Sequence, residues 1–245
     1  MRKTLITIIS ASTLLLSCKG GGASEVKDAD LKETVVEKVE EQSAICLIDN
    51  LSIRETPSKK GKWLAAMSLG EKVTYTGEEI LDSVSKKQFC KVKLIDGKEG
   101  WTRASLMGIN AEVGVMKDEV VVYKRPDLST ITEKKYSPMD IVAILDQKEE
   151  WIHVKGKRTE GEYIEEGWIK SSNISKTSAD IAVARLAGIA MNKSSMTERI
   201  NALQKITSNS DMSESSFIPL IEEKIALYQE KNQPLNVEEA TDGEL

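Results

Sequence analysis

The chain has 245 residues, 40% of them hydrophobic and 30% charged, and its formal net charge is −5. This length allows one large domain or two to three small ones. An acidic chain has no basic surface to attract phosphate backbones, so its charge disfavours nucleic acids as partners. The same charge argues against docking on an anionic membrane through protein charges alone.

The N-terminus has the order of charges and apolar residues that is typical of a secreted protein. Two basic residues precede an apolar stretch over 5–16, which is too short to span a bilayer and is typical of a signal peptide. Ser17-Cys18 follows and resembles the lipobox of bacterial lipoproteins, in which a small residue precedes the cysteine that is lipidated. The resemblance implies a signal peptide over 1–17 and a covalent lipid, such as palmitate, on Cys18, with the lipid bilayer as partner. The alternative is a truncated membrane anchor with an incidental cysteine.

The expected lipid also indicates where the rest of the chain lies. Everything after Cys18 is expected outside the cytoplasm, in the cell envelope, and Lys19 favours the outer membrane where a cell has two membranes. Residues 18–43 combine three glycines with Lys, Glu and Asp and contain no aromatic residue. Such a segment cannot bury enough apolar surface to offset the entropy of ordering, so we predict a flexible acidic tether.

Short β-type runs follow over 44–110. Thr56-Pro57-Ser58 breaks the chain after the second run, and Asp96-Gly97 predicts a tight hairpin before the last one. The runs that predict five strands are 44–48, 51–54, 72–76, 89–94 and 100–102.

The same order of features returns over 111–176. The spacing from Pro57 to Gly70 equals that from Pro126 to Met139. Internal repetition of this kind predicts the same small β domain twice. Further equivalent positions are Phe89 and Trp151, and Gly100-Trp101 and Gly167-Trp168.

Residues of the first copy form the pattern L-x-I-R-x-x-P, L-G-x-K-V and F-x-K-V-x-L-x-D-G-K-x-G-W. They are Leu51, Ile53, Arg54, Pro57, Leu69, Gly70, Lys72, Val73, Phe89, Lys91, Val92, Leu94, Asp96, Gly97, Lys98, Gly100 and Trp101. This pattern resembles the bacterial SH3 (SH3b) family. The second copy is diverged, because Tyr123 stands in place of Arg54 and Met139 in place of Gly70. The resemblance implies two tandem small SH3-like β-barrels, over 44–110 and 111–176, in a mainly β fold with C-terminal helices.

The hydrophobic period becomes helical from residue 177, so 177–231 is predicted to form a short helical region. Ser195 and Glu198 have the spacing of a capping box ahead of an apolar stripe. The acidic residues over 232–245 are predicted to form a disordered tail.

Beyond Cys18 the chain has two cysteines and one histidine. Cys46 and Cys90 are both expected to point inward, as a disulfide or as two buried free thiols. His153 matches the position of Lys91 in a strand and is expected to face solvent. One histidine excludes zinc sites of the usual His/Cys type. We therefore expect no catalytic residue, no metal and no cofactor other than the lipid.

Aromatic residues are the best candidates for a ligand surface. Trp63 lies in a lysine-rich loop where no core role is evident, although half-buried packing is the alternative. Trp101 and Trp168 occupy the Gly-Trp position that often closes an SH3b barrel, so packing is the alternative for them too. The ligand-binding candidates are Trp63, Tyr75, Phe89, Trp101, Trp151 and Trp168.

The resemblance implies a binding function, because SH3b domains recognise cell-wall peptides or other proteins. We expect a membrane-anchored envelope lipoprotein that binds a peptidoglycan peptide or an envelope protein without catalysis. The alternative is a surface-displayed scaffold or receptor that binds a protein partner through its barrels or C-terminal helices.

Overall fold

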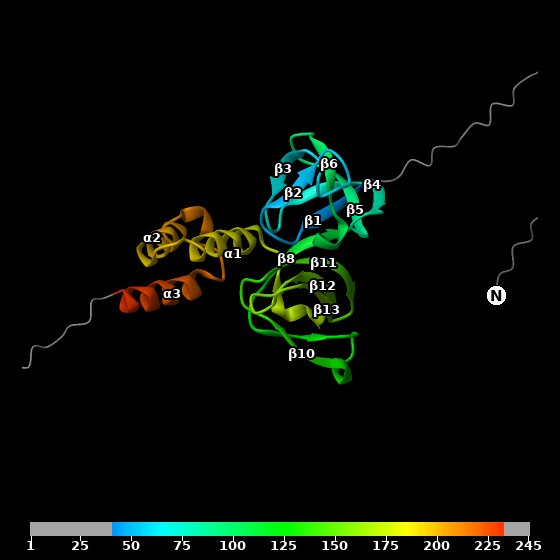
Figure 1. Cartoon of the computed structure of the whole chain (residues 1–245). Coiled ribbons are helices and arrows are strands. Elements are labelled where there is room, and N and C mark those ends of the chain that lie inside the picture. Colours follow the sequence, from blue (N-terminus) through cyan, green and yellow to red (C-terminus); the bar gives the residue numbers. More distant parts are fainter. Residues whose placement is uncertain (1–40, 233–245) are drawn as a thin grey trace, which may run out of the picture. The chain divides into compact units, whose positions relative to one another are not determined.

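The computed structural model describes residues 41–232, which form fourteen strands followed by three α-helices (Figure 1). The strands form two antiparallel seven-stranded sheets, and the expected mainly β fold with C-terminal helices is confirmed. The expected leader, Cys18, the acidic tail beyond residue 232 and all but the last three residues of the expected tether lie outside the described residues. Within 41–232, no helix is both long and apolar enough to cross a membrane.

The first sheet has the strand order β3-β2-β6-β5-β4-β1-β7. Its strands are β1 (Gln42–Cys46), β2 (Leu51–Arg54), β3 (Trp63–Met67), β4 (Lys72–Asp82), β5 (Lys87–Lys93), β6 (Glu99–Arg103) and β7 (Met107–Ile109). The hairpin predicted at Asp96-Gly97 is confirmed, since this turn joins β5 to β6 and Gly97 has a φ of 82°.

Two strands of the first sheet, β3 and β7, have no counterpart among the five predicted ones. Trp63 is the first residue of β3, so its predicted position in a loop is wrong. The sequence of β3, Trp-Leu-Ala-Ala-Met, has only Trp63 as a strand-favouring residue and contains two alanines, so its overall β propensity is low. Pairing with β2 at the edge of the sheet makes it a strand.

The second sheet has the order β10-β9-β13-β12-β11-β8-β14, which is the first order with each number raised by seven. Its strands are β8 (Glu112–Met116), β9 (Val120–Tyr123), β10 (Ile131–Tyr136), β11 (Ile141–Lys148), β12 (Trp151–Lys157), β13 (Ile164–Lys170) and β14 (Ile174–Ser175). Met139 keeps the left-handed backbone of its equivalent, with a φ of 69° against 75° at Gly70. The repeat read from the sequence is therefore also present in strand order and in local backbone conformation.

Strand β1 is buried on both of its faces. Ala44 and Cys46 belong to the core of the first barrel, whereas Ile45 and Leu47 pack against Ala111 and Ala143. This division follows from the period of two along a strand, which sends alternate side chains to opposite faces. The two barrels therefore share a hydrophobic contact layer.

The polypeptide ends in three helices, α1 (Ser178–Met191), α2 (Met196–Thr207) and α3 (Ile218–Lys231). The predicted capping box at Ser195 and Glu198 is confirmed, with both reciprocal hydrogen bonds present. The helices share a core with each other and with Val115 and Ile141 of the second barrel.

Candidate functional site

In each barrel a row of side chains crosses neighbouring strands on the outer face. In the first barrel, Arg54 of β2 pairs with Trp63 of β3 on one side and Trp101 of β6 on the other. Trp101 also pairs with Lys91 of β5. Directly paired residues point to the same face of a sheet, so these four side chains form one row, which we call the first aromatic row.

The glycine that precedes the tryptophan of β6 and of β13 shows on which face of the sheet each row lies. A Cβ atom at Gly100 would lie 2.5 Å from Cγ2 of Ile53, a core residue, so Gly100 faces the barrel interior. The next residue, Trp101, therefore points outward. The same holds in the second barrel, where a Cβ atom at Gly167 would lie 2.4 Å from Cγ1 of Val122.

The first aromatic row presents one exposed indole and one covered indole. Trp63 is 58% exposed and Trp101 is 9% exposed. Arg54 lies between them and donates from Nη1 to the carbonyl oxygen of Gly61 at 2.8 Å. Within residues 41–232 it has no carboxylate partner, so its charge remains available to a ligand.

The charge of Lys91, at the end of the row, is by contrast compensated by two carboxylates. Its Nζ lies 2.7 Å from Oε1 of Glu78 and 3.4 Å from Oε2 of Glu99. The hydrogen bond that Lys91 donates to Glu78 and the charges of both carboxylates raise the pKa of Lys91.

The second barrel has an equivalent row, formed by Ile131, Tyr123, Trp168 and His153 across β10, β9, β13 and β12. We call it the second aromatic row. The ring of His153 stacks on Trp168, with centroids 4.8 Å apart and an interplanar angle of 14°. Nε2 of His153 lies 3.3 Å from Oε1 of Glu166. His153 is thus half-buried against an indole rather than freely solvent-facing.

Other predicted aromatics lie beside these rows. Trp151, 6% exposed, meets Tyr123 edge-on at 4.9 Å between centroids, and Nζ of Lys170 lies 3.9 Å from its ring centroid. Phe89, the equivalent of Trp151, is 2% exposed and pairs with Arg103 on the outer face. Both rings are buried and offer little surface to a ligand.

Tyr75 does not join the other candidates. It pairs with Val92, a core residue, and packs against the core of the first barrel. Burial, followed by the nearby Glu79 carboxylate, raises the pKa of Tyr75. Of the six predicted aromatics, three therefore belong to the two rows, two lie beside the rows and one faces the interior of the first barrel.

The two cysteines of the described segment are free, buried thiols, so the disulfide alternative is wrong for this structure. Strand β4 lies between β1 and β5. The Cys46 amide donates a hydrogen bond to the carbonyl oxygen of Glu71, just before β4, whereas Cys90 pairs with Glu79, eight residues further along. A disulfide needs Cα atoms within about 7 Å, and two strand spacings already amount to about 9.6 Å.

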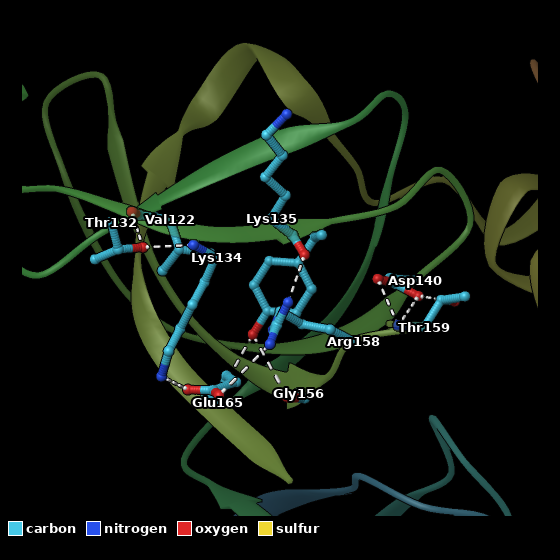
Figure 2. Close-up of polar contacts among 10 residues, drawn as sticks. Val122, Thr132, Lys134, Lys135, Asp140, Gly156, Arg158, Thr159 and Glu165 are labelled. Carbon is cyan, nitrogen blue, oxygen red and sulfur yellow. Dashed lines mark hydrogen bonds and ion pairs between the residues drawn. The ribbon is translucent and has the colours of Figure 1, made fainter. Parts of the chain in front are cut away.

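A polar network at the second barrel was not predicted from the sequence (Figure 2). The hydroxyl of Tyr136 donates to the carbonyl of Glu165 at 3.2 Å. Arg158 reaches both the carbonyl of Lys135, at 3.3 Å, and the carboxylate of Glu165, at 3.7 Å. Tyr136 comes from β10, Arg158 follows β12 and Glu165 lies in β13, so the network ties these segments together.

Figure 2 also shows Asp140, whose buried carboxylate accepts several hydrogen bonds. Its carboxylate accepts a hydrogen bond from the Thr159 hydroxyl at 2.7 Å, which Figure 2 shows. It also accepts one from the Ser137 amide at 2.8 Å. Burial raises the pKa of Asp140, against these hydrogen bonds, which lower it. Every contact of this carboxylate holds a turn in place, which is a structural role.

No group of three or more His, Cys, Asp or Glu side chains suited to a metal ion occurs within 41–232.

A family model described as the bacterial SH3 domain matches residues 49–107. This range runs from just before β2 to the first residue of β7. The chain contains a bacterial SH3 domain. The first aromatic row lies entirely within this SH3 domain, and the second barrel repeats its strand order.

Two solved structures show weaker similarity. The chain is 16% identical to NlpC2 and 14% identical to NlpC1, both from Trichomonas vaginalis, each with a TM-score of 0.23. Each match covers 63% of this chain, and 56% and 54% of those chains respectively. The chain thus matches little more than half the length of these structures, and similarity at this level assigns no function. No curated protein matches the chain.

Proposed function

We propose that the protein is an envelope lipoprotein that binds cell-wall peptide, without catalysis, through the outer face of its SH3 domain. The observation that carries this proposal is the first aromatic row, in which Arg54, with no carboxylate partner within residues 41–232, lies between an exposed and a covered indole. Indole rings stack on apolar and amide groups, and a guanidinium binds carboxylates in a bidentate manner. Amides and carboxylates are the groups that a wall peptide carries.

Several features support a non-catalytic role. Burial raises the pKa of Cys46 to about 11 and that of Cys90 to about 12, so both stay protonated and poorly nucleophilic at neutral pH. The ring of His153 stacks on Trp168 and its Nε2 contacts Glu166, so the partners of this imidazole are an indole and a carboxylate rather than a thiol or a hydroxyl.

The lipid anchor in this proposal rests on the sequence before the described residues. Ser17-Cys18 at the end of an apolar leader supports it, and the first test is fractionation of cells that express the chain. The wild-type chain is expected in the membrane fraction and the Cys18→Ala variant outside it.

The binding proposal is tested by co-sedimentation of the full chain with purified sacculi at physiological salt. We expect Trp63→Ala to weaken retention by roughly tenfold, because an aromatic anchor of an interface contributes about 1–2 kcal/mol or more. Leu81→Ala is the matched control, because Leu81 is 59% exposed in the same barrel but lies in the β4–β5 hairpin, away from the row.

If Trp63→Ala and Leu81→Ala are retained equally well, the first aromatic row is not part of the binding site. Absence of retention for the wild-type chain would overturn the proposal and favour a scaffold with a protein partner, which cross-linking on whole cells would then identify.

A further inference from the structure

Three cations gather on the outer face of the first barrel, next to the first aromatic row. Arg103 of β6 pairs with Phe89 of β5. Lys87 lies two residues before Phe89 on the same strand, so it points to the same face and is a diagonal neighbour of Arg103. Lys59, in the loop between β2 and β3, completes the group, which we call the basic cluster. The charge of Lys59, followed by that of Arg103, lowers the pKa of Lys87, so the three charges act on one another at close range.

The charges of the basic cluster are not paired within the part of the chain that the structure describes. None of its three residues forms an ion pair within residues 41–232. Asp82 pairs with Lys87 across β4 and β5. A hydrogen bond from Ser85 is the largest cause that lowers the pKa of Asp82, and the cation that contributes is Lys86. Both charges that shift the pKa of Lys87 are positive, so cations dominate the electrostatic field at this ammonium group.

The loop that carries Lys59 adds to this positive charge. Residues 55–62 contain Lys59, Lys60 and Lys62 against a single carboxylate, Glu55. The net charge of −5 makes a long phosphate backbone an unfavourable partner for the whole chain, but a small anion meets only the local charge. The composition of the chain did not predict this positive surface.

The second barrel shows that the fold does not require the basic cluster. The positions that the repeat aligns with the cluster are Leu128, Glu149 and Lys170. Only Lys170, which pairs with Trp151, is a cation, and its Nζ lies 2.6 Å from Oε1 of Glu150. Because like charges held close together destabilise a sheet, the uncompensated cluster of the first barrel indicates a site for an anion.

The arrangement of the cluster indicates which anion fits. Its side chains come from a loop and from two strands, so they can approach one group from three elements. A terminal phosphate presents three oxygens and a charge of about −1.5 to −2 at neutral pH, whereas a carboxylate presents two oxygens and one charge. A guanidinium binds phosphate through two parallel hydrogen bonds, and an ammonium group binds it as a point charge.

Nearby carboxylates disfavour a flat anionic surface as the partner. Glu78 and Glu99 hold Lys91 on the same outer face, and they would repel an anionic bilayer that approaches the whole face. We infer that the basic cluster binds the terminal phosphate group of a water-soluble molecule. This inference goes beyond the binding of wall peptide and does not rest on it.

The test is isothermal titration calorimetry, in which inorganic pyrophosphate is titrated into the purified full chain in the absence of divalent cations. We expect saturable binding that weakens with added salt. The double variant Lys87→Gln/Arg103→Gln should raise the Kd by roughly tenfold or more, because it removes two of the three cations. Circular dichroism should show that this variant is folded. Absence of binding by the wild-type chain would overturn the proposal.

The matched control is Lys124→Gln/Arg125→Gln, which makes the same change in net charge at two exposed residues of the second barrel. An unchanged Kd for this control supports the basic cluster, whereas an equal loss in both double variants overturns the proposal in favour of general charge attraction. Trp63→Ala should leave the Kd for pyrophosphate unchanged, so failure here is distinguishable from failure of wall-peptide binding.

Two competitors test the chemistry of the ligand. Citrate, a tricarboxylate, should bind at least roughly tenfold more weakly than pyrophosphate, and equal affinity would overturn the assignment to phosphate. Vesicles of phosphatidylglycerol should leave the Kd for pyrophosphate unchanged, and competition by them would overturn the assignment to a water-soluble ligand.

Discussion

Asp180 shows how one residue joins the second barrel to the helices. Its carboxylate accepts hydrogen bonds from the hydroxyls of Ser175 and Ser215 at 2.6 and 2.7 Å and from the Ser216 amide at 2.7 Å. Ser175 belongs to β14, whereas Ser215 and Ser216 precede α3. Asp180 is 5% exposed and has no ion pair within 41–232, so hydrogen bonds rather than a neighbouring cation stabilise its charge.

Asp180→Ala is therefore expected to lower the free energy of unfolding by roughly 2–4 kcal/mol at pH 7, because it leaves buried donors without an acceptor. Burial by itself raises the pKa of Asp180, but the hydrogen bonds from Ser175, Ser215 and Ser216 outweigh it, and the pKa is lowered. Because the native pKa of Asp180 is lowered, its charged carboxylate stabilises the fold at pH values above the ordinary pKa of 3.8. This stabilisation is lost as the pH falls from 3.8 through the lowered native pKa. Urea unfolding at several pH values should show that the difference in free energy of unfolding between the wild-type chain and Asp180→Ala becomes smaller below pH 3.8. Asp211→Ala, at an exposed position, is the control.

The reactivity of the two buried thiols can also be tested. With their pKa values raised to about 11 and about 12, Cys46 and Cys90 should resist iodoacetamide in the native protein and react after unfolding. Mass spectrometry of the unfolded, non-reduced chain should find both alkylated. A mass that requires reduction before alkylation would show that they are bridged.

Helix α2 shows how local sequence signals determine an element. The Ser195 hydroxyl accepts from the Glu198 amide at 3.1 Å, and the Glu198 carboxylate accepts from the Ser195 amide at 3.4 Å. Ser195→Ala should lower the free energy of unfolding by about 1 kcal/mol, measured by thermal unfolding. Thr197→Ala, one position into the helix and exposed, should change it little; a similar loss in both variants would rule out the cap as the cause.

Elements with a local signal were predictable from the sequence, and elements without one were not. Asp96-Gly97 and the Ser195 capping box each specify their own geometry, so the hairpin and the helix start were found. The edge strand β3 depends on pairing with β2, which no local pattern in its own sequence reveals.

The candidate site was predictable in composition but not in arrangement. The tryptophans were identified by residue type, but their grouping into rows depends on strand register. Arg54, between the two indoles, was known only as part of the family pattern. The network of Tyr136, Arg158 and Glu165 joins residues far apart in the sequence, so no sequence motif or spacing predicts it.

At the scale of the whole molecule, the two barrels pack so closely that their contact admits no added atom. A Cβ atom at Gly108 would lie 2.3 Å from Cβ of Ala143, and Nζ of Lys155 donates to the carbonyl of Met107 at 2.9 Å. Gly108→Ala should therefore lower the free energy of unfolding by roughly 1–3 kcal/mol, because β7 and β11 must move apart.

Hydrogen exchange should locate this effect, with faster exchange in β1 and β11 than in the wild-type chain. Gly188→Ala is the control, since a Cβ atom there meets nothing within 4 Å and alanine favours a helix. Unchanged exchange in β1 and β11 of Gly108→Ala would show that the barrels do not depend on this contact.

The position of β1 also bears on how the protein withstands mechanical load. The strand begins at Gln42 and pairs antiparallel with both β4 and β7, and it is covered on both faces. A pull on residue 41 along the strand axis would load these hydrogen bonds in shear, all together, rather than peel them one by one. Forced unfolding depends on the rate of crossing such a barrier, so a load applied at the N-terminal side of the described residues would meet its resistance in this clamped first strand.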